Sequence, residues 1–396
     1  MEPRMIGIDA LGLAVPDAFL PLAALAARRG VPEAKLTAGL GLHAMAVPSP
    51  EDDTVTLAAR AAASALARGG VSPGEIGLCV VGTETAVDHS KPVASFVQGL
   101  LGLPASCRVF EAKHACFGGT AGLMAALDWI RAGSARGKKA LVVCSDIARY
   151  GIGTPGEPTQ GAGAVALVVS ERPRLVAIDP ETVGTYSRDV MDFWRPLDRS
   201  DALVDGHYSV ECYLAALDGA FDAHRALVGE AAARPGYTDR FAAMLYHVPY
   251  PKMAQKAHAR LRARDGDDAP EVSFEAKVRA SLALPRVVGN VYTGSLYLAL
   301  ASLLATSGGR DLAGERALFF SYGSGCCAEL FTGQIMPGAQ AALADLPAAL
   351  TSRRELTVDE YEALFQARDA ARAPARAPSG AWPRFLGVED GKRVYG

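Results

Sequence analysis

Cys116 stands in a segment whose residue types suit a nucleophile. It follows Glu111, Lys113 and His114 and precedes two glycines and a run rich in Ala and Leu. This pattern is typical of a cysteine at the start of a helix, where the macrodipole favours the thiolate. A small core residue is the ordinary role of cysteine, and it suits the other six cysteines better. We therefore expect Cys116 to be a nucleophile with a lowered thiol pKa.

Three other segments place reactive groups beside Gly or Pro turns after apolar runs, where α/β folds commonly hold their sites. Glu84 ends such a run, and partial desolvation raises a carboxylate pKa towards that of a useful base. His247 lies in a loop stiffened by prolines, and Lys252 follows five positions on, placed to meet a phosphate or carboxylate. Asn290 offers an amide donor near a helix start. Each has a structural alternative: a solvated turn residue, a structural histidine and a helix cap.

Short apolar runs alternate with Ala/Leu-rich stretches along the chain. The runs 76–81, 140–144, 164–169 and 317–320 predict buried strands, and 55–67, 118–132 and 292–306 predict helices that end at glycines. This alternation indicates the α/β fold class.

An internal repeat predicts two related halves. Residues 117–127 align with 290–300, and a Gly-x-Gly sequence precedes a strand-like run at 161–163 and again at 323–325. We expect an N-terminal half over residues 1–170, with Glu84 and Cys116, and a C-terminal half over residues 171–396, with His247 and Asn290.

Composition excludes several classes of protein. A net charge of −3 without a long basic run gives no reason to expect nucleic-acid binding. The seven cysteines have irregular spacing and no Cys-x-x-Cys pair, which favours neither a disulfide framework nor a metal site. No signal-peptide pattern and no stretch of 18 apolar residues is present, so we expect a cytoplasmic protein that does not enter the membrane.

A nucleophilic cysteine with His and Asn donors resembles the thiolase-superfamily condensing enzymes, and the added Glu84 narrows the resemblance to the 3-hydroxy-3-methylglutaryl-CoA synthase family. The resemblance runs along nearly the whole chain. The matching stretches are 41–47, 82–85, 88–92, 111–122, 145–151, 157–161, 192–196, 205–209, 247–252, 289–295 and 321–325.

This resemblance implies a thiolase-like fold with a layered αβαβα architecture, a homodimer, and a triad of Glu84, Cys116 and His247. The substrates implied are acetyl-CoA and acetoacetyl-CoA, with no further cofactor. It also implies substrate-binding residues, with Lys252 near the CoA phosphates and the others in the active site: Asp146, Tyr150, Thr159, Asp192, Asn290 and Ser321. The chain departs from the family at Phe117, where the family usually has Tyr.

The expected reaction begins with acetylation of Cys116. Glu84 then takes a methyl proton, while backbone N–H groups at Cys116 and within 323–325 stabilise the enolate oxygen. The carbanion attacks acetoacetyl-CoA held by His247 and Asn290, and water releases 3-hydroxy-3-methylglutaryl-CoA for the mevalonate route to isoprenoids.

Three alternatives share part of this pattern. A carrier-protein-dependent synthase of polyketide β-branching would use the same triad on acyl-carrier-protein thioesters. A ketoacyl synthase of the Cys/His/Asn type would lack the role of Glu84. A non-catalytic scaffold or thiol sensor would have no single hyper-reactive cysteine.

Overall fold

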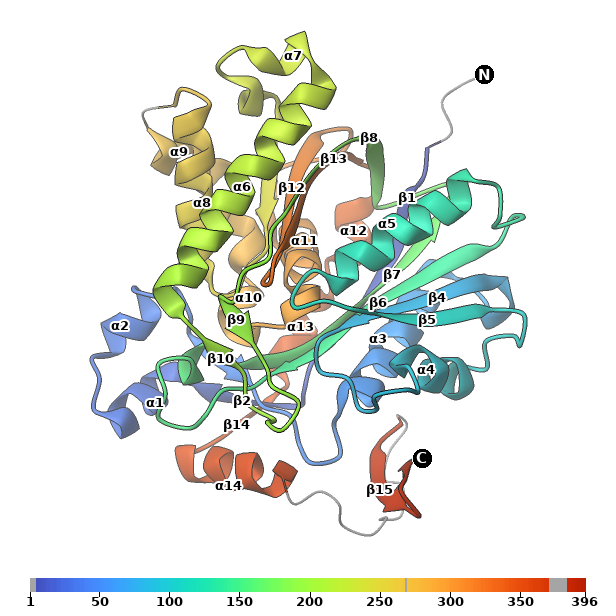
Figure 1. The fold of residues 1–396 in the computed structure, drawn as a ribbon, viewed down its shortest axis with the longest axis vertical. Coiled ribbons are helices and arrows are strands. Elements are labelled where there is room, and N and C mark those ends of the chain that lie inside the picture. Colours follow the sequence, from blue (N-terminus) through green and yellow to red (C-terminus); the bar gives the residue numbers. More distant parts are fainter. Residues whose placement is uncertain (1–4, 268, 370–382) are drawn as a thin grey trace.

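A computed structural model describes residues 5–267, 269–369 and 383–396, and its main feature is a nine-stranded mixed sheet (Figure 1). The strands follow one another across the sheet in the order β11 (Ala243–Tyr246), β12 (Arg316–Gly323), β13 (Cys327–Ile335), β8 (Val176–Ser187), β1 (Gly7–Ala14), β7 (Gly161–Ser170), β6 (Lys139–Ala148), β4 (Ile76–Thr83) and β5 (Arg108–Lys113). The predicted strands are all present in it.

Smaller sheets and the helices complete the described part of the chain. The small sheets are β10 (Leu203–Val204) with β9 (Phe193–Trp194), β14 (Arg354–Glu355) with β2 (Ala18–Pro21) and β3 (Ala44–Ala46), and β15 (Phe385–Glu389) with β16 (Lys392–Tyr395). The α-helices are α1 (Leu22–Arg29), α2 (Glu33–Thr37), α3 (Thr54–Gly69), α4 (Val93–Leu101), α5 (Gly118–Arg131), α6 (Gly206–Val228), α7 (Glu230–Ala233), α8 (Pro251–Arg264), α9 (Pro270–Lys277), α10 (Pro285–Val288), α11 (Ser295–Thr306), α12 (Ala339–Leu343), α13 (Leu346–Thr351) and α14 (Val358–Asp369). Short 3₁₀ turns are η1 (Pro73–Glu75), η2 (Glu157–Thr159), η3 (Tyr237–Arg240), η4 (Arg279–Leu282) and η5 (Tyr292–Gly294).

The sheet contains one strand pattern twice. Strand β4 is parallel to β6, which is antiparallel to β7, which is antiparallel to β1. Strands β11, β12, β13 and β8 repeat this sequence of one parallel and two antiparallel pairs. Only two residue pairs, at Gly7 and Ile8 of β1, join the two sets. The halves therefore form one continuous sheet, although the boundary at residue 170 stays a prediction.

Two glycines show how closely a helix packs on its strand in each half. A Cβ atom at Gly12 of β1 would lie 2.2 Å from the Ala61 carbonyl oxygen of α3. A Cβ atom at Gly184 of β8 would lie 2.2 Å from the Ala220 carbonyl oxygen of α6. Such distances exclude any side chain, so the same close packing is built at equivalent places of the two halves.

The two helices of the internal repeat, α5 and α11, meet inside the molecule. The hydroxyls of Thr120 and Tyr297 lie 2.8 Å apart, and Thr120 also donates to Ser321 of β12 at 2.7 Å. The prediction that both stretches are helices is confirmed, except that residues 292–294 form the turn η5 before α11. Helix α5 thus begins where strands of both halves converge.

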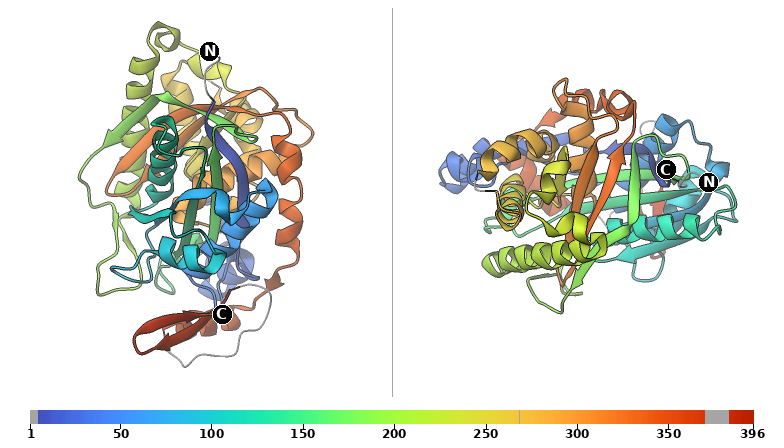
Figure 2. Two further views of the ribbon diagram at one scale, coloured as in Figure 1. Left: turned by 90° about the vertical axis from the view of Figure 1, so that its right-hand side faces the viewer. Right: turned by 90° about the horizontal axis from the view of Figure 1, so that it is seen from above.

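The hairpin β15–β16 lies at one end of the long axis and α7 at the other (Figure 2). Arg393 and the Tyr395 hydroxyl both bind the Asp53 carboxylate, at 2.7 and 2.8 Å, and Asp53 caps α3.

Among the helices of the described residues, none has the length and apolar character needed to cross a membrane.

Candidate active site

Cys116 lies in the tight connection between β5 and α5, two residues before the helix begins. Its φ of 56° is in the left-handed region, which few residues other than glycine adopt. The next turn approaches β6 so closely that a Cβ atom at Gly119 would lie 2.4 Å from the sulfur of Cys144. The glycines after Cys116 therefore allow the helix start to sit against the sheet, with the thiol at its mouth.

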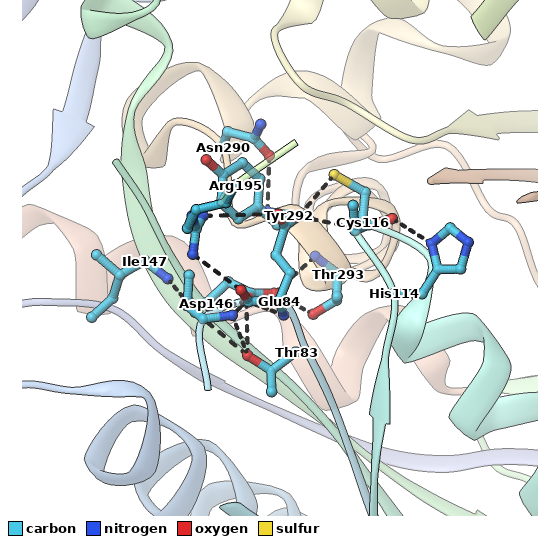
Figure 3. Close-up of polar contacts among 12 residues, drawn as sticks. Thr83, Glu84, His114, Cys116, Asp146, Ile147, Arg195, Asn290, Tyr292 and Thr293 are labelled. Carbon is cyan, nitrogen blue, oxygen red and sulfur yellow. Dashed lines mark hydrogen bonds and ion pairs between the residues drawn. The ribbon is translucent and has the colours of Figure 1, made fainter. Parts of the chain in front are cut away.

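Glu84 follows β4 directly and points at Cys116 (Figure 3). Its Oε1 accepts a hydrogen bond from the Cys116 amide at 2.9 Å and another from the thiol at 3.4 Å. The side chain is 8% exposed. Burial, together with the nearby Asp146 carboxylate, raises the pKa of Glu84 to about 8. A carboxylate in this range can both accept and return a proton near neutral pH.

The prediction of a lowered thiol pKa at Cys116 is wrong for this site. Burial is the main cause of an increase well above the ordinary value, and the carboxylates of Glu84, Asp146 and Asp192 add to it. These effects on the pKa outweigh the opposite effect of the helix macrodipole, so the resting group is the thiol. Activation of Cys116 then requires transfer of its proton during attack.

Asp146, at the end of β6, connects the Glu84 segment to η5. It is fully buried, and its Oδ1 accepts hydrogen bonds from the Glu84 amide at 2.9 Å and the Thr85 hydroxyl at 2.7 Å. Its Oδ2 accepts the amide and hydroxyl protons of Thr293. Both carboxylate oxygens bind protein donors, so the geometry gives Asp146 a role in positioning Glu84.

His247 and Ser321 leave adjacent strands side by side. Tyr246 of β11 pairs with Phe320 of β12, and the His247 amide donates to the Phe320 carbonyl at 2.8 Å. Burial lowers the pKa of His247 to about 3, so its imidazole is neutral at physiological pH and offers one N–H donor. The Thr120–Ser321 hydrogen bond joins this strand end to α5.

The end of β12 also abuts the Cys116 loop. A Cβ atom at Gly323 would lie 2.0 Å from the Ala115 carbonyl oxygen and 2.5 Å from the Cβ of Phe117. Phe117 is buried, and its ring packs edge-on against His114 with centroids 5.5 Å apart. The second half therefore forms one wall of the nucleophile's surroundings.

Asn290 begins the segment that leads into α11. Its Oδ1 accepts hydrogen bonds from the Tyr292 amide at 2.8 Å and the Ser295 hydroxyl at 2.9 Å. The oxygen thus caps the turn, as the structural alternative proposed, while the amide nitrogen is the atom left to act as a donor. Figure 3 shows Asn290 beside Tyr292.

Asp192 orders the loop after β12. Its Oδ2 accepts from the Tyr322 hydroxyl at 2.8 Å, and its Oδ1 accepts from the Gly325 amide at 3.0 Å. The Gly325 amide was one of the predicted enolate donors, and the Cys116 amide was another. Both are engaged by carboxylates in this structure, so either must be released before it can bind an enolate.

The other predicted residues lie farther from this centre or at its edge. Tyr150 is buried with its ring 6.4 Å from Phe193, which in turn packs on Tyr292. Thr159 lies in η2, where its hydroxyl donates to the Gly156 carbonyl at 2.8 Å. Lys252 is in the first turn of α8 and lines a separate pocket of about 210 Å³.

Arg195 contacts Glu84 but was given no role from the sequence. Its Nη1 donates to the Glu84 carbonyl oxygen at 3.0 Å, and its Nη2 lies 3.8 Å from Oε2 of the carboxylate. In the sequence, the one indication that Arg195 belongs to the site is its position in the stretch 192–196, which matches the family. Because Arg195 comes from the second half and Glu84 from the first, no local pattern reveals the contact.

Comparison with known proteins gives a consistent set of relatives. The family model for the hydroxymethylglutaryl-coenzyme A synthase N terminal matches residues 2–173, and that for the C terminal matches residues 176–272 and 267–378. The chain is 40% identical to the hydroxymethylglutaryl-CoA synthase of Enterococcus faecalis over 362 residues, 91% of each chain. It is 33% identical to the polyketide biosynthesis 3-hydroxy-3-methylglutaryl-ACP synthase PksG of Bacillus subtilis, over 93% of this chain and 90% of that one.

Solved structures agree. MvaS in complex with 3-hydroxy-3-methylglutaryl coenzyme A is 49% identical, with a TM-score of 0.94 over 100% of this chain and 99% of that one. The HMG synthase of the curacin biosynthetic pathway, in complex with holo donor-ACP, is 30% identical, with a TM-score of 0.92 over 99% and 100%. The predicted fold class, α/β with a thiolase-like architecture, is confirmed.

Proposed function

The chain belongs to the hydroxymethylglutaryl-CoA synthase family, and we propose that it condenses acetyl-CoA with acetoacetyl-CoA to give 3-hydroxy-3-methylglutaryl-CoA and free CoA. One observation carries the proposal: the buried Glu84 carboxylate lies 3.4 Å from the Cys116 sulfur. A thiol alone serves many acyl transfers. A carboxylate at this distance is placed to take a proton from an acetyl group carried on that thiol.

The first step is acetyl transfer to Cys116. The sulfur forms a bond to the acetyl carbon, the bond from that carbon to the CoA sulfur breaks, and the thiol proton ends on CoA. Since burial keeps the thiol protonated, the proton leaves as the new bond forms, and Glu84 is its nearest acceptor at 3.4 Å.

The second step forms the carbon nucleophile. A methyl group beside a thioester is a weaker acid than a carboxylic acid by more than ~10 pKa units, or over ~14 kcal/mol. The raised pKa of Glu84 narrows this gap by only a few units. Donors aimed at the enolate oxygen must supply the rest, at ~3 to 4 kcal/mol each. The Cys116 amide is the nearest candidate once Glu84 releases it.

The remaining steps use the second half of the chain. The enolate carbon attacks the ketone of acetoacetyl-CoA, whose oxygen accepts hydrogen bonds from neutral His247 and from the amide nitrogen of Asn290. The proton held by Glu84 passes to the new alkoxide. Water then cleaves the thioester to Cys116, which releases the product and restores the thiol.

A basic pocket supports the use of CoA thioesters. Lys252, Arg279 and Arg286 line the same pocket of about 210 Å³ beside the N-terminus of α8. Burial lowers the pKa of Arg286, and its Nε has no hydrogen-bond partner within the described residues. Cations and a helix N-terminus together suit an anionic group, so we assign the CoA phosphates to this pocket.

The finer features follow as part of the same proposal. We propose a homodimer formed along β5, which pairs only with β4 among the described strands and exposes 37% of Phe110. The enzyme would work in the cytoplasm, supply the mevalonate route to isoprenoids, and need no cofactor besides its CoA substrates. Sedimentation of the wild type and of Phe110→Asp tests the dimer.

A carrier-protein-dependent synthase is the main alternative, because its chemistry would be the same. The higher identities, 40% and 49%, are to a CoA synthase and to a structure holding a CoA product, against 33% and 30% for carrier-protein relatives. Purified protein should form product from acetyl-CoA and acetoacetyl-CoA alone. Product formed only after addition of acyl-carrier protein would establish the alternative. Incubation with labelled acetyl-CoA that leaves no acetyl group on any cysteine would favour a scaffold.

A further inference from the structure

Arg195 reaches Glu84 from the opposite side to Cys116. In Figure 3 the Glu84 carboxylate lies between the two residues. Cys116 binds Oε1, whereas Nη2 of Arg195 lies 3.8 Å from Oε2, beyond hydrogen-bond distance. The Nη1 group binds the Glu84 carbonyl oxygen at 3.0 Å, which fixes the guanidinium against this residue. Glu84 is therefore held by one neighbour and approached by another.

The Arg195 guanidinium has N–H donors that make no hydrogen bond to any described residue. Its Nε and Nη2 atoms are buried, and neither has a hydrogen-bond partner within the described parts of the chain. The side chain is 18% exposed, and its Cζ lies 5.9 Å from the Tyr292 ring centroid. Buried donors without acceptors are costly in a folded protein. An acceptor that moves by about an ångström towards Arg195 would satisfy them.

Cys116 supplies the reason for such a movement. Its amide and thiol both donate to Oε1 of Glu84 in this structure. Acetylation replaces the thiol proton by an acyl group, and the amide can stabilise the enolate oxygen only after Oε1 has left it. The carboxylate must then move while charged, in a site that also holds the buried Asp146 carboxylate.

We propose that Arg195 is a positioning residue that receives the Glu84 carboxylate when it releases Cys116, and that it stabilises the ionised form which removes the methyl proton. This inference rests on the proposed function of the site. The electrostatic effect of Arg195 on Glu84 has the direction that this role requires. Burial and, to a smaller extent, Asp146 raise the pKa of Glu84, whereas Arg195 lowers it. The groups that face Glu84 are Cys116 before α5, Asp146 of β6, Tyr150 after β6, Arg195 after β9 and Tyr292 of η5.

The test compares Arg195→Gln, Arg195→Lys and Arg199→Gln with the wild type. Glu84, Arg195 and Arg199 line one cavity of about 740 Å³. Arg199 is exposed, so Arg199→Gln is the matched control for the loss of one positive charge from this cavity. Each protein is incubated with labelled acetyl-CoA to count acetyl groups on Cys116. Condensation with acetoacetyl-CoA is then measured from pH 6 to about pH 10, at saturating substrate.

Loss of an opposite charge at this distance moves a carboxylate pKa up by about one to two units. We expect Arg195→Gln to keep one acetyl group per chain, to shift the acidic limb of the condensation profile up by that amount, and to slow condensation about 10- to 100-fold at pH 7. Arg195→Lys should restore most of the shift, and Arg199→Gln should match the wild type. An unshifted profile in Arg195→Gln would overturn the inference.

A second measurement does not depend on how the variants fold. A crystal structure of the wild-type acetyl-enzyme should place a Glu84 carboxylate oxygen within hydrogen-bond distance of Nε or Nη2 of Arg195. A carboxylate still bound to the Cys116 amide would refute the inference. A wild type that forms no 3-hydroxy-3-methylglutaryl-CoA would instead refute the proposed function, so the two failures are distinguishable.

Discussion

Oε1 of Glu84 accepts hydrogen bonds from the amide and from the thiol of Cys116, at 2.9 and 3.4 Å. The base and the nucleophile thus restrain each other before any substrate is present. The two groups act on each other in opposite directions: Glu84 raises the pKa of the Cys116 thiol, whereas the hydrogen bonds from Cys116 lower the pKa of Glu84 against the larger increase from burial. The contact also has a use, since the carboxylate is already within reach of whatever the sulfur carries.

Replacing Glu84 by Gln should stabilise the protein at high pH. Glu84 releases its proton near pH 8 when folded and near pH 4.5 when unfolded. Between these values the folded state binds more protons, so its stability falls as pH rises. We expect Glu84→Gln to gain up to about 4 to 5 kcal/mol over the wild type at pH 8.5, from a pKa difference of about 3.5 units, and little at pH 5, as measured by urea unfolding.

Glu75 provides a control of opposite sign for this experiment. The Ser72 amide and hydroxyl hold the pKa of Glu75 below its ordinary value. Glu75→Gln should therefore show no gain at pH 8.5. Equal stability of Glu84→Gln and wild type at both pH values would show that Glu84 is not held in its neutral form.

Asp146→Asn should disturb both the fold and the condensation step. The Asn amide keeps one acceptor oxygen and replaces the other by an NH2 donor. This NH2 group would face either the two donors of Thr293 or those of the Glu84 segment, which leaves buried donors unsatisfied. We expect a loss of about 2 to 4 kcal/mol in the free energy of unfolding, measured by thermal denaturation. Asp198→Asn changes an exposed carboxylate and should be neutral. A neutral Asp146→Asn would contradict the positioning role.

Lys252→Ala should weaken the binding of CoA thioesters without changing the chemistry. Loss of a phosphate contact worth about 1 kcal/mol raises KM roughly fivefold. KM for an acetyl thioester of pantetheine, which lacks the CoA diphosphate, should not change. Lys256→Ala, one turn along α8 on the exposed side, is the matched control. A fall in kcat with KM unchanged would remove Lys252 from the CoA pocket.

The sequence was sufficient to place Cys116 before a helix and Glu84 after a strand, because turn residues and apolar runs are local signals. It was not sufficient for the charge states. The pKa of Cys116 depends on burial and on carboxylates that β4, β6 and the second half bring together. The macrodipole alone predicts a lowered pKa for Cys116, which is the wrong direction.

Contacts between the halves also lay beyond the sequence. Arg195 meets Glu84 across 111 residues, and Asp146 meets Thr293 across 147. The internal repeat predicted related helices, yet not that Thr120 of one would bind Tyr297 of the other. The resemblance named Asp146 and Asp192 as binding residues, and the structure shows both carboxylates engaged with protein donors.

The central claim is that Glu84 acts on an acetyl group carried by Cys116. Its most direct test is to incubate Glu84→Gln with labelled acetyl-CoA, map the label by mass spectrometry of peptides, and then add acetoacetyl-CoA. We predict that Cys116 still gains one acetyl group per chain, more slowly than in the wild type because Glu84 no longer takes the thiol proton, and that Cys116→Ala gains none. Condensation of the acetylated protein should be slowed about 10²- to 10⁴-fold. Label on another cysteine, or condensation at the wild-type rate, would contradict the account.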